Sequence, residues 1–445
     1  MPKTSTQFVC QACGATSPRW AGKCPECTAW NSLVETQSTP IIKGRRSSAN
    51  VLQPEKLASI DVSRYPRIDT EIRDLNQVLG GGLVVGSVIL LSGDPGIGKS
   101  TLVLQLAANI SKTKPVLYVS GEESTNQIKL RAERLGLTDA DLDLLAETNT
   151  DAVAATIAAG KYGLIIVDSI QTMATEALTG GAGSVGQITA SSQMLQAVAK
   201  SHHAAMIIIG HVTKEGSIAG PKILEHLVDV VLYLEGDKYG SFKALRGIKN
   251  RFGSTNEVGI FEMKEQGLVE VANPSEALLA ERQSGPGSVV VATLEGTRPL
   301  LVEVQALVST TVFGYPKRTA AGFDLNRLNL LAAVLTKRSG LNLSNQDIYV
   351  NVVGGLKVAE PAIDLAIILS IASAFTGQAL KPDTVVFGEV GLSGEIRSVS
   401  NVSRRLAEAT KLGFTTAIGP RGSDKVIAVT TVQEAIAGAL QVLKS

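Results

Sequence analysis

Apolar residues are patterned in two different ways along the chain. In the middle, short runs in which nearly every residue is apolar alternate with amphipathic segments. The runs at 87–92, 114–120, 164–168 and 204–210 are typical of strands buried on both faces, and 102–110 has the period of a helix. Strands that alternate with helices predict an α/β fold with a mainly parallel central sheet.

The pattern changes after residue 285. Valine-rich segments at 288–294 and 299–308 predict strands, 325–338 predicts a helix, and 347–353 predicts a further strand. Strands and helices that do not alternate regularly are typical of an α+β domain.

Length and local composition set the expected domain boundaries. A chain of 445 residues corresponds to about three domains at roughly 150 residues each. We expect a small module at 1–35 and a flexible linker, rich in Ser, Thr, Pro and Lys, at 36–59. The α/β domain then occupies 60–275, and the α+β domain occupies 284–445.

Charge and hydropathy exclude several classes of protein. The 42 Lys and Arg residues nearly balance the 41 Asp and Glu residues, so any surface that binds nucleic acid must be local. With 44% hydrophobic and 19% charged residues, the chain is globular rather than disordered. Neither a membrane-length apolar run nor a hydrophobic leader is evident, which predicts a cytoplasmic protein with no membrane partner.

All four cysteines lie in the first module, as the pairs Cys10/Cys13 and Cys24/Cys27. Two residues separate the members of each pair, which is typical of two knuckles that bind one structural Zn²⁺ through four thiolates. A module this short cannot bury enough apolar surface to fold alone, so we expect the metal to supply its folding free energy. Two disulfides or a redox function are the alternatives, and a reducing cytoplasm disfavours the disulfides.

The only two tryptophans, Trp20 and Trp30, belong to the same module. Aromatic side chains in a miniature zinc module usually form its core. Exposed aromatic rings can instead stack on nucleic-acid bases. We expect the core role.

A phosphate-binding loop joins the first buried run to the helix that follows. Residues 93–101 read Gly-Asp-Pro-Gly-Ile-Gly-Lys-Ser-Thr, the G-x-x-x-x-G-K-S spacing in strand–loop–helix context. Glycines let the backbone wrap the phosphates, and N–H groups at the helix start face the anion. Lys99 is predicted to pair with the β- and γ-phosphate oxygens, and the Ser100 hydroxyl to bind Mg²⁺.

Polar residues at the ends of the other buried runs complete the predicted site. Asp168 is placed to hold Mg²⁺, and Glu122, with Glu123 as second candidate, to polarise the attacking water. The alternative for the two glutamates is a solvated helix start, and His211 is equally compatible with sensing the γ-phosphate or with a structural hydrogen bond. The predicted nucleotide-binding residues are Gly93, Asp94, Pro95, Gly96, Ile97, Gly98, Lys99, Ser100, Thr101 and Asp168.

Two cations follow an extended segment at 241–248. Lys249 and Arg251 are two residues apart, so on a strand they share a face, and they could reach the γ-phosphate of a neighbouring subunit. Read alone, this Lys-Asn-Arg sequence is equally a solvated basic turn. Glycine-rich loops at 180–186 and 213–220, with Lys214 and Lys222, are candidates for tracking a nucleic-acid backbone.

Taken together, the motifs GDPGIGKST, YVSGEES, LIIVDS, GHVTKEG, LEHLVDVVLYLEGD and KNRFG, with the four cysteines, resemble the bacterial RadA/Sms family of DNA repair ATPases over almost the whole chain. The resemblance implies a RecA-like ATPase core in which Glu122 is catalytic and Lys249 and Arg251 act in trans. It also implies a homohexameric ring that uses ATP, Mg²⁺ and Zn²⁺ and binds single-stranded and branched DNA. Such a ring would drive branch migration of intermediates made by the RecA recombinase.

The carboxy-terminal domain resembles the Lon protease domain. Ala362 stands where that family has its nucleophilic Ser, and Ser403 stands where it has its Lys. Alanine cannot attack a carbonyl, so we expect the fold to be retained and the proteolytic chemistry lost. Our hypothesis is that the domain is a ring-forming scaffold that also offers DNA-binding surface, and the alternative for each basic side chain is a solvated position on a helix. The candidate phosphate contacts are Lys337, Arg338, Arg404 and Arg405.

Two alternative functions remain at this stage. One is an ATP-dependent protease, against which the substitutions at Ala362 and Ser403 argue. The other is a recombination mediator that uses ATP as an assembly switch to load RecA without unwinding DNA. Both a mediator and a helicase need the same ATPase core, so the sequence does not separate them.

Overall fold

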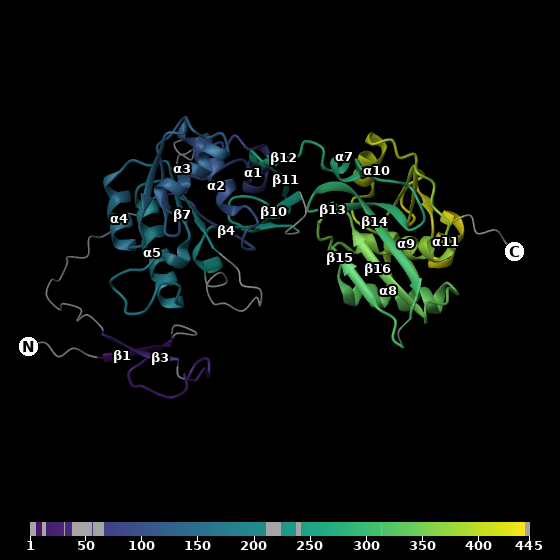
Figure 1. Cartoon of the computed structure of the whole chain (residues 1–445), viewed down its shortest axis with the longest axis horizontal. Helices are drawn as coiled ribbons and strands as arrows, with labels where there is room; N and C mark the ends of the chain where they lie inside the picture. The colour runs from purple at the N-terminus through teal and green to yellow at the C-terminus, as the bar shows by residue number, and fades with distance from the viewer. Residues whose placement is uncertain are drawn as a thin grey trace, which may run out of the picture. The chain divides into compact units, whose positions relative to one another are not determined.

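The computed structural model describes residues 6–10, 15–30, 32–37, 56, 66–210, 224–236, 242–312 and 314–440. The contacts within the chain divide it into two units (Figure 1). The first unit comprises Met1–Glu235, Leu245–Thr255 and Glu265–Leu268, and the second comprises Gly236–Ala244, Asn256–Lys264 and Val269–Ser445. The boundaries at 35, 59, 275 and 284 stay predictions, and most of the expected linker lies outside the described residues.

The amino-terminal module is a small antiparallel sheet in the order β2-β1-β3. Its strands are β1 (Thr6–Cys10), β2 (Thr16–Ser17) and β3 (Leu33–Gln37). The buried centre consists of Cys10, Cys24 and Leu33, with Phe8 packed against it. Cysteine sulfurs thus occupy the space that a larger side chain would fill in an ordinary core.

The expectation that the two tryptophans form this core is wrong. Trp20 is 60% exposed and Trp30 is 75% exposed. Both rings lie near Gly22, where a Cβ would be 3.7 Å from Trp30 and 3.9 Å from Trp20. The Lys23 ammonium lies 5.9 Å from the centre of the Trp30 ring, within the range of a cation–π contact. An indole is too large for a centre already filled by sulfur atoms, so both rings remain at the surface.

The described part of the α/β region forms a nine-stranded sheet in the order β12-β11-β10-β9-β4-β8-β7-β5-β6. The six strands from β9 to β6 in this order run parallel. The strands are β4 (Val88–Gly93), β5 (Val116–Ser120), β6 (Leu142–Ala146), β7 (Leu164–Asp168), β8 (Ala205–Ile209), β9 (Val230–Glu235), β10 (Phe242–Asn250), β11 (Val258–Lys264) and β12 (Gly267–Glu270). Every residue of β4, β5, β7 and β8 is buried, as the four apolar runs predicted.

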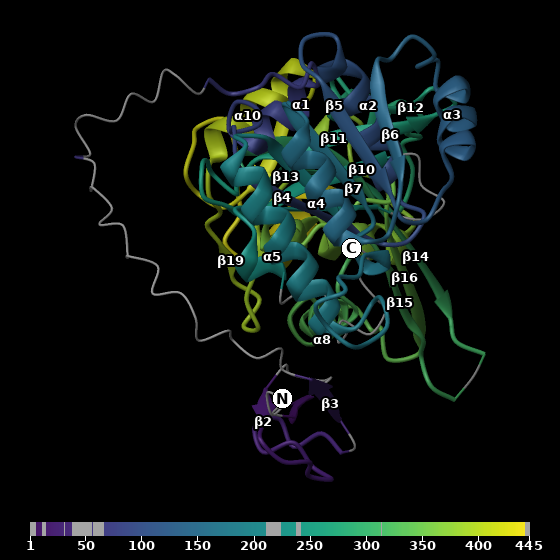
Figure 2. The same ribbon diagram turned by 90° about the vertical axis from the view of Figure 1, so that its left-hand side faces the viewer.

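Helices cover both faces of the parallel strands. They are α1 (Arg73–Leu79), α2 (Lys99–Ser111), α3 (Thr125–Arg134), α4 (Thr150–Ala159) and α5 (Val185–Ser201), with the 3-10 helix η3 (Ile170–Thr172) after β7. The helices α4 and α5 lie side by side and share a core with alternate residues of β4, β5, β7 and β8 (Figure 2). The helix α2 packs against β4, β5 and β7. None of the helices in the described ranges has the length and apolar character needed to cross a bilayer.

The second unit contains a mixed sheet in the order β15-β16-β14-β13-β17-β20-β21, and its small β18-β19 hairpin is separate. The strands are β13 (Ser288–Glu295), β14 (Arg298–Thr310), β15 (Arg318–Ala321), β16 (Gln346–Val352), β17 (Thr384–Val386), β18 (Glu389–Val390), β19 (Ile396–Arg397), β20 (Thr416–Gly419) and β21 (Ile427–Ala428). The helices are α7 (Pro274–Leu279), α8 (Leu325–Arg338), α9 (Asp364–Thr376), α10 (Val402–Lys411) and α11 (Val432–Leu440), with η4 (Pro361–Ile363) before α9. The predicted helix at 325–338 and the three predicted strands are confirmed.

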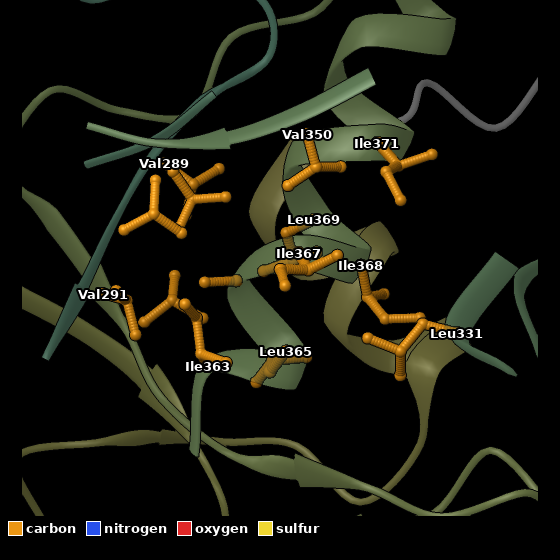
Figure 3. Close-up of a cluster of buried hydrophobic side chains, with 14 of the residues drawn as sticks. Val289, Val291, Leu331, Val350, Ile363, Leu365, Ile367, Ile368, Leu369 and Ile371 are labelled. Carbon is orange, nitrogen blue, oxygen red and sulfur yellow. The ribbon is translucent and has the colours of Figure 1, made fainter. Parts of the chain in front are cut away.

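The helix α9 is the centre of this unit. Ten of its residues, from Asp364 to Ser373, are buried. Figure 3 shows Leu365, Ile367, Ile368, Leu369 and Ile371 among apolar side chains of the sheet and of α8. A helix that is apolar on all sides must be covered on all sides, which explains why both the sheet and helices α8 and α11 pack around it.

The region that resembles the protease site holds a buried ion pair. Ala362 is 1% exposed within η4, and two positions before it Glu360 forms a bidentate ion pair with Arg405. The Arg405 guanidinium also donates to the carbonyl oxygens of Ala292 at 2.7 Å and Ser400 at 2.9 Å. An alanine and an ion pair thus stand in the region where the protease domain has its serine and lysine.

The expectation that Arg405 contacts DNA is therefore wrong. Arg405 is 0% exposed, because it lies on the same inward face of α10 as Leu406 and Ala409. Its neighbour Arg404 is exposed and donates to the Thr297 carbonyl oxygen at 3.2 Å. Lys337 and Arg338 are also exposed, at the carboxyl end of α8.

Replacing Arg405 with Met should destabilise the second unit by about 3–5 kcal/mol, because Glu360, whose side chain is only 19% exposed, would lose its partner. The double substitution Glu360→Gln with Arg405→Met should recover part of this loss. Differential scanning calorimetry of the full chain measures both effects. Arg404→Met is the control, and a midpoint shift as large for Arg404→Met as for Arg405→Met would contradict the assignment.

Candidate functional site

The phosphate-binding loop lies where β4 ends and α2 begins. Gly93 has φ +148°, and a Cβ there would lie 2.3 Å from the Leu234 carbonyl oxygen, so no larger residue fits. Gly96 and Gly98 have φ values of +77° and +113°, in the region that glycine favours. Gly98 is the N-cap of α2, and the backbone N–H groups at the helix start are available to an anion. The structure thus places residues 94–98 in the loop between β4 and α2, and the predicted Lys99, Ser100 and Thr101 in the first turn of the helix.

Lys99 is the buried cation of this loop. The side chain is 3% exposed, and its ammonium donates to the carbonyl oxygens of Gly93 at 2.8 Å and Asp94 at 2.9 Å. Burial lowers the pKa of Lys99, whereas the negative charges of Asp168, Asp94 and Glu122 oppose that shift. The site therefore concentrates carboxylates around one ammonium, as expected for binding Mg²⁺ and triphosphate together.

Asp168 lies at the carboxyl end of β7 and is 5% exposed. The next strand in the sheet is β5, and the phenol of Tyr118 on that strand donates to Asp168 Oδ2 at 2.7 Å. The Asp168–Ser169 peptide bond is cis. One oxygen of the carboxylate is thus engaged by the protein, and the second can serve the hydration shell of Mg²⁺.

The two neighbouring glutamates have different environments. Glu122 is exposed and accepts from the Ser169 hydroxyl at 2.5 Å. Glu123 instead forms an ion pair with Arg131 at 2.7 Å. Just before them, a Cβ at Gly121 would be 2.0 Å from Thr172 Oγ1, so this turn passes against η3 as only glycine allows. Glu122 therefore faces the residue after Asp168, and Glu123 faces α3.

Lys249 and Arg251 contact one segment of their own chain. The Lys249 ammonium donates to the carbonyl oxygens of Glu225 at 2.6 Å and Val228 at 2.8 Å. Arg251 pairs with Asp229 at 3.1 Å, and Asp229 also accepts from the backbone N–H of Val88 at 3.1 Å. Both cations thus contact residues 225–229, although β10 ends at Asn250 and Arg251 lies just beyond the strand rather than on its face.

Val88 is the first residue of β4, whereas the phosphate loop follows its last residue, Gly93. Five residue steps at about 3.3 Å separate the two ends by roughly 17 Å. The two cations therefore lie at the opposite end of the sheet from the phosphate loop of their own chain.

The turn that follows the cations is fixed against α1. Arg67 donates to the carbonyl oxygens of Phe252 at 2.7 Å and Leu79 at 3.1 Å. A Cβ on Gly253 would lie 3.1 Å from the Gly80 Cα, so two glycines allow the two segments to touch. This packing explains why Phe-Gly follows the two cations.

Three thiols converge in the amino-terminal module. The Sγ atoms of Cys10, Cys24 and Cys27 lie within 4.8 Å of one another, and Cys10 and Cys27 are 3.6 Å apart. Tetrahedral zinc–thiolate bonds of about 2.3 Å place sulfur atoms about 3.8 Å apart, whereas a disulfide needs about 2.05 Å. None of the three described cysteines forms a disulfide, which contradicts the disulfide alternative for them and fits Zn²⁺.

Several predicted residues lie outside the described part of the chain. They are Cys13, His211, Lys214 and Lys222. The other glycine-rich loop is anchored, because Gln187 donates to the carbonyl oxygens of Leu178 at 2.9 Å and Gly180 at 3.3 Å.

Sequence reasoning missed Tyr118, Arg131, Ser169 and Asp229. A tyrosine within an otherwise apolar buried strand was a usable signal for Tyr118, since a buried phenol requires a hydrogen-bond partner. Arg131 belongs to α3, 13 positions after Tyr118, and nothing in the sequence around it gave a comparable signal.

The fold and the site define a RecA-like P-loop ATPase with a zinc module and a Lon-protease-like carboxy-terminal domain. Family models match the chain in three places: an AAA domain at 53–217, a rubredoxin metal binding domain at 8–35 and subunit ChlI of Mg-chelatase at 305–423. Two DNA repair proteins RadA resemble it over 98% of this chain and 99% of their own: that of Halalkalibacterium halodurans is 51% identical and that of Bacillus subtilis 50%. The chain belongs to the DNA repair protein RadA family.

Two solved structures are also similar to the chain. The crystal structure of the RadB recombinase is 22% identical, with a TM-score of 0.37 over 46% of this chain and 99% of that one. The ATPase domain of G40P is 14% identical, with a TM-score of 0.41 over 46% of this chain and 92% of that one. Membership of the RadA family makes the chain a DNA repair and recombination ATPase whose cofactors are ATP, Mg²⁺ and Zn²⁺.

Replacing Cys24 and Cys27 with Ser should remove zinc and unfold the amino-terminal module, because the thiolates supply the metal-binding free energy that holds so small a module together. Metal analysis and limited proteolysis of the full chain measure the two effects. Glu26→Gln, an exposed change between the same cysteines, should retain the metal. Stoichiometric zinc in the double Cys variant would contradict the assignment.

Proposed function

We propose that this protein is an ATP-driven motor that forms a homohexameric ring on single-stranded DNA and promotes branch migration of recombination intermediates made by RecA. The observation that carries the proposal is that the phosphate loop and the two cations lie at opposite ends of one sheet. The phosphate loop follows Gly93, and Lys249 and Arg251 lie near Val88 at the other end of the same strand. Cations placed there can complete only the nucleotide site of a neighbouring subunit.

The chemistry follows from the residues around Lys99. The phosphate loop and Lys99 bind the triphosphate, and the Ser100 hydroxyl and Asp168 are the residues that would hold Mg²⁺. The metal, when bound, neutralises charge on the phosphate oxygens. Glu122 accepts a hydrogen bond from the attacking water and orients it. Lys249 and Arg251 of the next subunit stabilise the negative charge that develops on the transferred phosphoryl group.

The second unit supports a scaffold function rather than proteolysis. Ala362 has no nucleophilic atom, Ser403 is an exposed residue of α10, and Glu360 and Arg405 pair at the position concerned. Lys337, Arg338 and Arg404 remain candidates for phosphate contacts, since their side chains are exposed. We place the activity in the cytoplasm, where DNA and RecA are available to it.

A recombination mediator that loads RecA without unwinding is the second candidate. Strand displacement on a forked substrate, with and without RecA, separates the two. A motor displaces the strand in an ATP-dependent reaction, whereas a mediator changes RecA filament formation and leaves the fork intact. ATP hydrolysis that is indifferent to DNA, with no displacement, would overturn the motor.

Glu122→Gln should lower the turnover of ATP by about 100-fold or more, because an amide cannot polarise the attacking water as a carboxylate does. Binding of a fluorescent ATP analogue should be retained. Glu133→Gln, at an exposed glutamate of α3, is the matched control and should stay within a few-fold of the wild-type turnover. Equal losses in both variants would remove Glu122 from its proposed role.

Arg251→Ala and Lys99→Ala should each abolish most DNA-stimulated hydrolysis. Mixing the two variants should restore part of the DNA-stimulated hydrolysis. Some interfaces between different subunits then combine an intact phosphate loop with an intact Arg251. Steady-state ATPase assays across mixing ratios measure the recovery. Strictly additive activities of the two separate variants would contradict action in trans.

A further inference from the structure

A chain of polar side chains leads from the buried residues Asp168 and Tyr118 to the partly exposed residues Arg131 and Glu123, in the direction of α3. Tyr118 is 0% exposed and donates to Asp168 Oδ2 at 2.7 Å. The Arg131 guanidinium donates to the Tyr118 phenol oxygen at 3.2 Å and pairs with Glu123 at 2.7 Å. Direct contacts therefore link four side chains in the order Asp168, Tyr118, Arg131 and Glu123. These contacts connect β7, β5 and α3.

We propose that Tyr118 and Arg131 are positioning residues that hold the metal-binding carboxylate of Asp168 and the Glu122–Glu123 turn in one fixed arrangement. The proposal rests on the nucleotide chemistry assigned above. Neither residue touches substrate or metal; each acts through a carboxylate, and the effect should appear as a change in the requirement for Mg²⁺.

The first link fixes the orientation of Asp168. A carboxylate can rotate about its side-chain bonds, and a hydrogen bond to one oxygen removes that freedom. Burial, and then the negative charge of Asp168, raise the pKa of Tyr118 well above its usual value. The hydrogen bond from the phenol engages Asp168 Oδ2 and leaves the second carboxylate oxygen to face the metal position.

The second link fixes the turn that carries Glu122. On one side of Glu122, the Gly121 N–H donates to the Asp168 carbonyl oxygen at 2.9 Å. On the other side, the Glu123 N–H donates to Ser120 Oγ at 2.9 Å, and the Glu123 side chain is held by Arg131. Glu122 thus lies between two anchored residues. Because Arg131 belongs to α3, the position of that helix determines both carboxylates at once.

Tyr118→Phe tests the first link, since it removes the hydroxyl and keeps the ring. We expect about a tenfold rise in the Mg²⁺ concentration needed for half-maximal hydrolysis, as is typical when a residue that orients a metal ligand is lost. The gain in affinity for a fluorescent ATP analogue on adding Mg²⁺ should fall by a similar factor, whereas affinity in EDTA should not change. This binding measurement does not depend on turnover.

Tyr162→Phe is the matched control. Its phenol also donates to a carboxylate, that of Asp143, but the Tyr162 side chain is only partly buried and lies before β7 rather than at the nucleotide site. This variant should need the same Mg²⁺ concentration for half-maximal hydrolysis as the wild type. A merely structural role for Tyr118 would lower the melting temperature and leave the Mg²⁺ dependence unchanged, and that outcome would overturn the proposal.

Arg131→Ala and Arg131→Lys test the second link. Arg131→Ala should raise the Mg²⁺ concentration needed for half-maximal hydrolysis, as Tyr118→Phe does. Arg131→Lys should raise it less, because a lysine can still pair with Glu123. Combining Arg131→Ala with Tyr118→Phe should give less than the product of the single effects, because both act through one chain. A combined effect equal to the product of the two single effects would overturn the proposed coupling between Tyr118 and Arg131. Failure of the motor proposal would instead appear as wild-type ATP hydrolysis without strand displacement, which leaves these Mg²⁺ measurements readable.

Discussion

The structure depends on a buried ammonium that is surrounded by negative charge at the start of a helix. Lys99 is stabilised in this position because loop carbonyl oxygens accept hydrogen bonds from its ammonium and because the charges of Asp168, Asp94 and Glu122 oppose the cost of its burial. Parallel strands deliver these groups to one edge, since β4, β5 and β7 all end there. Sheet direction therefore decides where the chemistry takes place, and the rest of the first unit keeps that edge rigid.

Much of this arrangement could be predicted from the sequence. The apolar runs identify β4, β5, β7 and β8 because strands buried on both faces need no polar alternation, and the glycine spacing identifies the loop because few backbones can wrap a phosphate. Local rules succeed at these places because the residues that cause the structure are neighbours in the sequence.

The errors occurred where the deciding contact is distant in sequence. Arg405 was expected at the surface, and only the fold brings it to Glu360, 45 positions earlier. The tryptophans were expected inside the first module, but the space there depends on how closely the cysteine sulfurs converge. The link from Tyr118 to Asp168 spans 50 positions and joins two strands that are neighbours only in the sheet. Such pairings depend on topology, which no local pattern contains.

The ion pair between Glu360 and Arg405 also bears on the history of the second unit. A protease ancestor would have kept an open pocket beside η4, but in this protein the same place is closed by charge, by hydrogen bonds from Thr293 and Leu294, and by a buried alanine. Restoring a serine at 362 alone would supply a hydroxyl without a general base, because Ser403 stands where the Lon protease domain has its lysine. Recovery of peptide cleavage would therefore need at least two coordinated changes.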